Sequence, residues 1–297
     1  MTRSKHIRRI SLHISMNFQR LRETGKGWRL LPEEMTLLLY SLFCLIVSLM
    51  LVQFLWVSFT SALLIYFQIP ATWHPLSITN ISKNWQYWNE SKLFMIYTSV
   101  PLILLYAGLV LSRRLVKNHS YTYKERLFLN WLSFILINSF IGGIMAGVFI
   151  YDGLGVVIQF MFPGIIRLIF LLIPFIIFIS TSKIWAKHFL KSAPSTRMIN
   201  RTQLRSRYLQ IIFTLPLLIS VIFLILYSFL QNKWYFGITV ASFSLMIPFI
   251  ITNRFFHEKV MLSKTDTASP QSITILIILM FLILIAAVSP FVSFQLG

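Results

Sequence analysis

Charged side chains are scarce in this chain of 297 residues. They make up 12% of it, against about 25% in ordinary globular domains, while hydrophobic residues make up 57% and the mean hydropathy is +0.74. Several apolar stretches are long enough to cross a hydrocarbon core of about 30 Å as helices. Segments such as "ILIILMFLILIAA" lack the polar and apolar alternation of a membrane barrel. The composition therefore excludes a soluble protein and predicts an all-α, polytopic helical membrane protein.

Residues that carry enzyme chemistry are also few. Cys44 is the sole cysteine, which excludes intrachain disulfides and cysteine-rich zinc sites. The six histidines fall in the expected connections and tails, and the chain has no Gly-rich phosphate loop, nucleophile elbow or pair of intramembrane aspartates. The sequence therefore predicts no catalytic residue, no metal site and no cofactor, and an enzyme is the less favoured class.

About seven transmembrane helices are predicted from the apolar runs. The first run has 35 residues, and one long helix is favoured over a hairpin near Gln53, because "LMLVQFLWVSF" contains no turn-forming residue. The predicted spans are Met35 to Ile69, Leu93 to Leu111, Leu127 to Tyr151, Gly164 to Thr181, Tyr208 to Leu230, Tyr235 to Thr252 and Ile273 to Phe291. A single bundle over residues 35–292 is expected, followed by a short outer tail, residues 293–297.

The distribution of basic residues predicts the direction of these spans. The amino-terminal segment and the second, fourth and sixth connections hold 23 of the 27 Lys and Arg residues, against three on the other side. Because Lys and Arg are retained on the cytoplasmic side, the amino terminus is expected inside and the carboxyl terminus outside. A bacterial cytoplasmic membrane is the expected location, with an organelle membrane as the alternative.

Residues 1–34 are predicted to form a basic, amphipathic cytoplasmic segment. Residues 1–22 contain no acid, and their apolar residues recur at helical spacing at Ile7, Ile10, Ile14, Phe18 and Leu21. Such a helix can lie in the membrane surface with its cations near anionic headgroups. An ordinary positive-inside anchor and a mitochondrial transit peptide are the alternatives.

Anionic lipids on the cytoplasmic side are the expected partners of the basic residues, and nucleic acid is not, because no segment is long enough for a soluble nucleic-acid domain. A second basic stretch lies in the fourth connection, where lysines four residues apart follow the fourth span. The residues predicted to contact headgroups are Arg8, Arg9, Arg20, Arg22, Lys183, Lys187, Lys191, Arg201 and Arg205. Retention of the connections on one side of the membrane would produce the same charge pattern.

Small residues mark one face of the third span. They recur in "NSFIGGIMAGVF" at intervals that let another helix approach closely. The predicted packing residues are Ser139, Gly142, Gly143, Ala146 and Gly147. A membrane-protein partner could also use this face.

The first outer connection is rich in aromatic residues, namely Trp73, Trp85, Tyr87 and Trp88. Amphipathic rings favour the headgroup level of a membrane, so an interfacial belt is the expected role. A lid that covers a ligand within the bundle is the alternative.

Asp152 and Arg167 form a candidate site for an anion or a partner. If the chain breaks at Pro163 and Gly164, residues 156–162 form a short separate segment that returns Arg167 to Asp152 at the outer surface. If one tilted helix runs from Val156 to Thr181, Arg167 lies about 17 Å along it, near mid-membrane. The first geometry is favoured because an unpaired arginine there costs about 2.5 to 3.5 kcal/mol. A structural ion pair is the simpler role for the two residues.

Function is predicted only as a class. A non-enzymatic, transporter-like bundle or a subunit of a membrane assembly fits best, and an intramembrane enzyme that acts on a lipid or peptide is the alternative. The transporter interpretation expects a cavity that reaches Arg167, Asn130, Asn138 or Gln53. The enzyme interpretation expects converging polar side chains.

Overall fold

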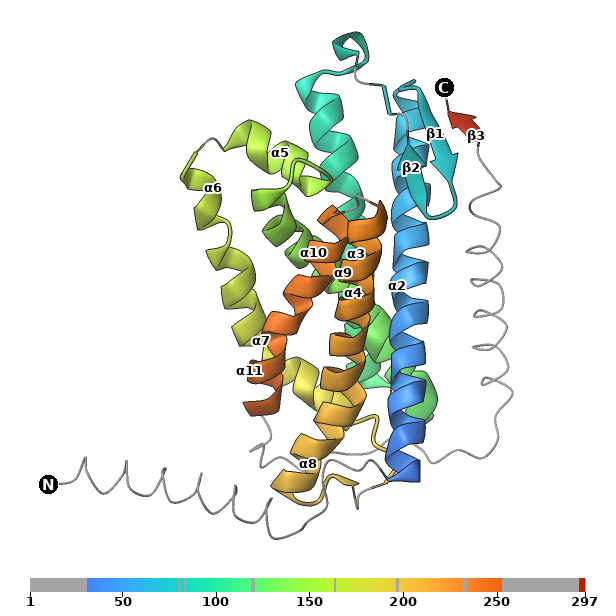
Figure 1. The fold of residues 1–297 in the computed structure, drawn as a ribbon, viewed down its shortest axis with the longest axis vertical. Coiled ribbons are helices and arrows are strands. Elements are labelled where there is room, and N and C mark those ends of the chain that lie inside the picture. The colour runs from blue at the N-terminus through green and yellow to red at the C-terminus, as the bar shows by residue number, and fades with distance from the viewer. Residues whose placement is uncertain are drawn as a thin grey trace, which may run out of the picture. The chain divides into compact units, whose positions relative to one another are not determined.

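The fold is seen in a computed structural model of the chain (Figure 1). It describes residues 31–79, 81–82, 84–118, 121–162, 164–195, 198–231, 234–252 and 294–296. The chain divides into two compact units, residues 1–37 and residues 38–297. Most of the predicted amphipathic segment, including Arg8, Arg9, Arg20 and Arg22, lies outside the described residues, and so does the predicted seventh span.

The described chain is mostly helical. Its α-helices are α2 (Pro32–Tyr66), α3 (Glu90–Lys117), α4 (Tyr123–Phe149), α5 (Leu154–Met161), α6 (Ile166–Ile169), α7 (Leu172–Leu190), α8 (Thr202–Leu209), α9 (Leu215–Gln231), α10 (Trp234–Ser242) and α11 (Ile247–Thr252). Three shorter helical turns are η1 (Trp85–Tyr87), the π-helical η3 (Gln210–Thr214) and η4 (Phe243–Met246).

Five helical stretches in the described residues are long and apolar enough to cross a membrane: Pro32–Tyr66, Glu90–Lys117, Tyr123–Phe149, Ile166–Leu190 and Thr202–Leu226. The first is one continuous α-helix of 35 residues, so the prediction of a single long helix is confirmed. The predicted sixth span corresponds to a shorter apolar stretch, in which η4 interrupts the path between α10 and α11. These stretches support an integral membrane protein.

Polar caps start two of the helices earlier than their apolar runs. Asn89 caps α3, where its Oδ1 accepts from the Lys92 amide at 2.8 Å. Thr122 and Glu125 form a capping box at the start of α4, in which each side chain accepts from the other residue's amide. As a result α4 begins four residues before the predicted Leu127.

In the first unit, the described residues form the start of α2. The Leu31 amide donates to Glu34 Oε2 at 2.9 Å, and Thr36 Oγ1 donates to the Pro32 carbonyl at 3.0 Å. Pro32 lacks an amide hydrogen and suits a first helical position, where no acceptor is present. The acidic residues of this turn, Glu33 and Glu34, complement the positive end of the helix dipole.

Aromatic rings from four elements fill the core of the second unit. Trp131 of α4 stacks on Phe213 of η3, with ring centres 5.3 Å apart and planes 5° apart. Phe134, one turn along α4, meets Phe213 and also Phe243 of η4 edge to face. The indole nitrogen of Trp131 donates to Ser41 Oγ at 2.8 Å, which satisfies its single donor.

The small-residue face of α4 packs against other helices of the same chain. All five predicted packing residues are buried. A Cβ atom on Gly142 would lie 2.6 Å from the Thr239 carbonyl oxygen of α10, and one on Gly147 would lie 2.8 Å from Gly155 of α5. The neighbouring backbones therefore approach α4 where it has no side chains.

A small sheet, which the sequence did not predict, accompanies the helices. Strands β1 (Ala71–His74) and β2 (Ser77–Thr79) form an antiparallel hairpin beside α2, and β3 (Phe294–Leu296) pairs antiparallel with β1 (Figure 1). The strand order is β2-β1-β3, with Thr72 opposite Thr79 on one side and Gln295 on the other. Residues of the predicted outer tail thus form an edge strand. Strands of three or four residues are too short for sequence periodicity to reveal.

The helical path between α4 and α7 is interrupted three times, after α4, after α5 and after α6. Helix α5 is separate from α6 and α7, and Gly164 between them has φ +61°, which favours glycine. The alternative of one helix from Val156 to Thr181 is therefore wrong, and the expected break near residue 164 is confirmed. Gln159 Nε2 of α5 donates to the Gly147 carbonyl at 3.0 Å, which ties α5 to the end of α4.

Candidate functional site

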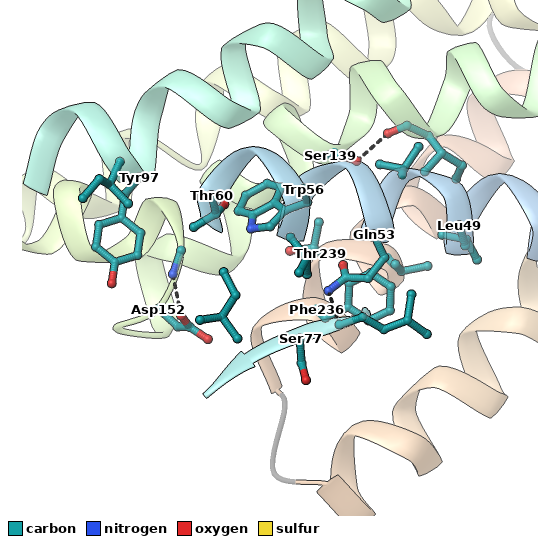
Figure 2. A pocket seen from close by; sticks show the side chains of 18 of the residues that line it. Leu49, Gln53, Trp56, Thr60, Ser77, Tyr97, Ser139, Asp152, Phe236 and Thr239 are labelled. Carbon is teal, nitrogen blue, oxygen red and sulfur yellow. Dashed lines mark hydrogen bonds between the residues drawn. The ribbon is translucent and has the colours of Figure 1, made fainter. Parts of the chain in front are cut away.

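A cavity of about 220 Å³ lies among α2, the β1–β2 hairpin, α3, α4, the link from α4 to α5, and α10 (Figure 2). Most of its wall is apolar, with Val57, Ile96 and Phe243 among the lining residues. A few polar side chains interrupt this wall. Mainly apolar clefts with a small number of polar groups are typical of small-molecule sites.

Helix α2 supplies one wall of the cavity. Leu49, Gln53, Trp56 and Thr60 are three or four residues apart and therefore lie along one face of the helix. At 1.5 Å per residue this stripe extends about 16 Å. The unbroken course of α2 is what makes a continuous wall of that length.

The hairpin forms a second wall. Gln53 Nε2 of α2 donates to the Leu76 carbonyl at 3.1 Å, so the tip of the hairpin is attached directly to the cavity-lining face of α2. Leu76, Ser77 and Ile78 then line the cavity. Part of the aromatic connection thus lines the cavity, and its role as a lid stays a prediction.

The aromatic residues of this connection pack within the fold. Trp88 donates its indole N–H to the Ser82 carbonyl at 2.8 Å and stacks on Tyr97 of α3, with ring centres 6.1 Å apart. Trp73 of β1 contacts Phe294 of β3 at 5.7 Å between ring centres. These contacts link the hairpin and the connection to elements on either side of them.

Asp152 stands at one end of the cavity, near Tyr97 (Figure 2). The link after α4 positions it: the Asp152 amide donates to the Ile150 carbonyl at 3.0 Å, and the Gly155 amide donates to the Asp152 carbonyl at 2.8 Å. The residue as a whole is accessible at the rim, while its carboxyl group lies against the protein and its Oδ1 accepts from the Gly153 amide at 2.7 Å. The surrounding protein removes water from the carboxylate and raises its pKa, while the Gly153 hydrogen bond opposes that rise.

The charge of the cavity is opposite to that of the whole chain. The formal net charge of the chain is +19, yet the residues found to line the cavity include Asp152 and no Lys or Arg. The remaining polar lining comes from hydroxyl, amide and indole groups, such as Thr60, Gln53 and Trp56. These groups suit a neutral or cationic molecule better than an anion.

The structure does not bring Asp152 and Arg167 together. Arg167 lies in α6, where its Nε donates to the Gly164 carbonyl at 3.4 Å, and no ion pair joins it to Asp152 in the described part of the chain. The intervening α5 has eight residues and is about 12 Å long, so it separates the two charges instead of returning one to the other. The proposed anion or partner role of the two residues stays a prediction.

The described headgroup candidates lie at the ends of α7 and α8. Lys183 and Lys187 belong to α7, Lys191 is its C-cap, and Arg201 is the N-cap of α8. Arg205 lies in α8, where its Nε donates to the Ile199 carbonyl at 2.6 Å. All five side chains are at least partly exposed. Their contact with lipid headgroups stays a prediction.

The predicted helix boundaries misplaced two buried polar residues. Arg126 and His188 were assigned to connections, but they lie in α4 and α7 and are only 1% and 4% exposed. Asn130, expected to reach a cavity, is buried beside His188 and is not among the residues that line the cavity of Figure 2. The capping sequence "TYKE" was the signal that α4 begins early enough to include Arg126.

Among the described residues, no group of three or more His, Cys, Asp or Glu side chains is arranged to hold a metal ion. Comparison with protein-family models, curated proteins and solved structures finds no match to this chain. The interpretation of the site therefore depends on its own geometry, a mainly apolar cavity with one carboxylate at its rim.

Proposed function

We propose that this protein is a transporter-like membrane bundle that binds a small amphipathic molecule, neutral or cationic, in the cavity between α2, the hairpin and α10. The observation that carries the proposal is the cavity itself, whose lining includes Gln53 of α2, one of the polar residues expected from the sequence for a transporter. The apolar wall suits the body of such a molecule, and Asp152 suits its polar end.

Aromatic side chains support the preference for a cation or a neutral group. Trp56 and Tyr97 line the cavity, and their ring faces attract cations. The volume of about 220 Å³ suits a molecule smaller than a typical drug. With the amino terminus in the cytoplasm, the hairpin end of the cavity would face the outer side, so a ligand would enter from there.

Two rival functions have less support. The subunit interpretation expects a partner on the glycine face of α4 or on the basic cytoplasmic face, and α10 and α5 already cover the first of these. The enzyme interpretation expects converging polar side chains, and those that line the cavity are hydroxyl and amide groups with one carboxylate but no His or Cys to act as a base. Binding without covalent chemistry is the function that this lining favours.

Cysteine labelling tests the proposal. In a Cys44→Ala background, Gln53→Cys and Thr239→Cys place thiols in the cavity, and Glu90→Cys places one at an exposed position. Ser133→Cys is the matched control, because Ser133 is fully buried between α4 and α3, where it donates to the Gly108 carbonyl. We expect a small water-soluble maleimide to label the two cavity thiols and the exposed thiol but not Ser133→Cys.

Labelling of Glu90→Cys alone would contradict a water-accessible cavity and with it the transporter-like function. Labelling of all four thiols would show that the bundle opens generally, and it would also count against a specific cavity. Protection of the two cavity thiols by hexyltrimethylammonium, with Glu90→Cys still labelled, is the further result expected of a binding site.

A further inference from the structure

Three side chains with unpartnered polar atoms are buried together away from the cavity. Arg126 and Asn130 lie four residues apart on one face of α4, and His188 lies on α7. They are 1%, 0% and 4% exposed. Asn130 Nδ2 donates to the His188 carbonyl at 2.8 Å, which holds the two helices together at this level.

One nitrogen or oxygen atom of each side chain has no hydrogen-bond partner among the described residues. These atoms are Arg126 Nε, Asn130 Oδ1 and His188 Nδ1. Arg126 does make one side-chain hydrogen bond, from Nη2 to the Asn118 carbonyl at 2.6 Å. Because unpaired buried polar groups are costly, a molecule that both accepts and donates hydrogen bonds would stabilise this cluster.

The charges in and near the cluster indicate which kind of molecule would bind there. His188 lies between Lys187 and Lys191 at the end of α7, and no carboxylate pairs with Arg126 in the described part of the chain. Glu125, the adjacent acid, already accepts from the Thr122 amide in the capping box. A buried guanidinium is normally paired with a carboxylate or a phosphate, so an anionic oxygen is the expected partner.

The position of the cluster favours phosphate. Arg126 is in the first turn of α4 and His188 is in the last turn of α7, so both lie at helix ends. The basic side chains of Lys187 and Lys191 surround this end of α7, which the charge distribution assigns to the cytoplasmic side. Basic pockets between membrane helices on that side are suited to lipid phosphate groups.

We propose that Arg126, Asn130 and His188 form an internal phosphate-binding site. A phosphate oxygen accepts from Arg126 Nε and, when His188 carries its proton on Nδ1, from that nitrogen. A hydroxyl group, on the phosphate or on an adjoining headgroup, donates to Asn130 Oδ1. The phosphate belongs either to inorganic phosphate or to an anionic phospholipid such as phosphatidylglycerol. The site is independent of the cavity and of the transporter-like function.

Thermal unfolding of the purified full chain tests the proposal and separates the two sources. Delipidated protein in detergent is titrated with inorganic phosphate against sodium chloride of equal ionic strength, and separately with short-chain phosphatidylglycerol against phosphatidylcholine. We expect Tm to rise with one of the two phosphate sources and not with its control. A response to inorganic phosphate identifies the free ion, and a response to phosphatidylglycerol alone identifies the lipid.

Arg126→Met removes the guanidinium but keeps an unbranched apolar side chain, and it is expected to weaken the apparent phosphate affinity about 10-fold or more. Arg113→Met is the matched control, because Arg113 is exposed near the end of α3, and it should respond like the original protein. Asn130→Asp places a carboxylate one helical turn from Arg126, and this internal counter-charge should abolish the response even if Arg126→Met does not fold.

A Tm that rises with neither phosphate source would overturn the proposal, because buried water would then be sufficient for the three atoms. An undiminished response in Arg126→Met or in Asn130→Asp would overturn it as well. If Arg113→Met loses as much of the Tm rise as Arg126→Met does, the rise comes from surface charge, and the internal site is rejected as well.

Discussion

Asp152 and Arg126 have opposite charges and opposite surroundings. Asp152 is exposed at the rim of a cavity, and its backbone neighbour Gly153 donates to it. Arg126 is enclosed, with one carbonyl as its side-chain partner and an unpaired Nε in the described structure. A rim carboxylate can exchange partners with the cavity contents, whereas an enclosed guanidinium needs a resident counter-charge. The two residues therefore suit different ligands.

The raised pKa of Asp152 predicts pH-dependent binding of cations. As the pH rises through this raised pKa the carboxylate gains its charge, so binding of hexyltrimethylammonium should strengthen about 3- to 10-fold. The probe itself does not titrate. Equilibrium binding to purified protein across a pH series measures the effect, and Asp152→Asn, which keeps an oxygen acceptor for the Gly153 amide, should bind weakly at every pH.

Octanol, a neutral probe of similar length, is the control and should bind equally at all pH values. The stability of the protein depends on pH with the opposite sign to cation binding. The folded state keeps its proton after the unfolded state has lost it, so this residue's contribution to stability falls as the pH rises through the raised pKa. Cation binding that strengthens on acidification would contradict the assigned role.

At the scale of elements, the apolar runs predicted where helices lie but not where they end. The Asn89 and Thr122 caps start α3 and α4 before their apolar residues, because side-chain acceptors satisfy the first amides of a helix. Helix α7 continues to Leu190, nine residues beyond the predicted Thr181, as the four-residue spacing of its lysines indicated, and so includes His188. The early start of α4 and the late end of α7 explain why Arg126 and His188 were assigned to connections.

The candidate cavity could be predicted only in part. Gln53 was expected to reach a cavity and Asp152 to mark a site, since polar residues are rare in such sequence. The contributions of Thr239, Tyr97 and the hairpin depend on contacts between segments far apart in the chain. A short strand such as β2 depends on its pairing with β1 and on the hydrogen bond from α2 to the adjoining Leu76.

Close packing of α4 against α10 predicts that Gly142 cannot be enlarged. The Cβ of Gly142→Ala would lie 2.6 Å from the Thr239 carbonyl oxygen, and a backbone atom cannot move aside as a flexible side chain can. We expect a loss of about 1–3 kcal/mol of stability, measured as a lower Tm in detergent. Labelling of Thr239→Cys should increase if α10 moves away.

Ala107→Leu supplies the control for added volume, because Ala107 is exposed on α3. It should leave Tm nearly unchanged, since added apolar volume there contacts no protein interior. An unchanged Tm in Gly142→Ala would mean that α10 does not pack on this face of α4.

At the scale of the whole molecule, basic charge is concentrated in alternate connections. The fourth connection holds seven Lys and Arg residues, while the third holds none. The cavity is associated with the connections that are poor in basic residues, through the hairpin and Asp152. The proposed cation cavity would thereby lie apart from the basic side of the membrane, where a cation would be repelled.

Three long helical stretches lie between Asn84 and Asn200, which predicts that these two exposed residues are on opposite sides of the membrane. In a Cys44→Ala background, a membrane-impermeant maleimide applied to intact cells should label Asn84→Cys and not Asn200→Cys, and lysis should expose the second thiol. Labelling of both thiols in intact cells would contradict three crossings. Labelling of Asn200→Cys alone would keep the crossings but reverse the direction, and the cavity would then open toward the cytoplasm.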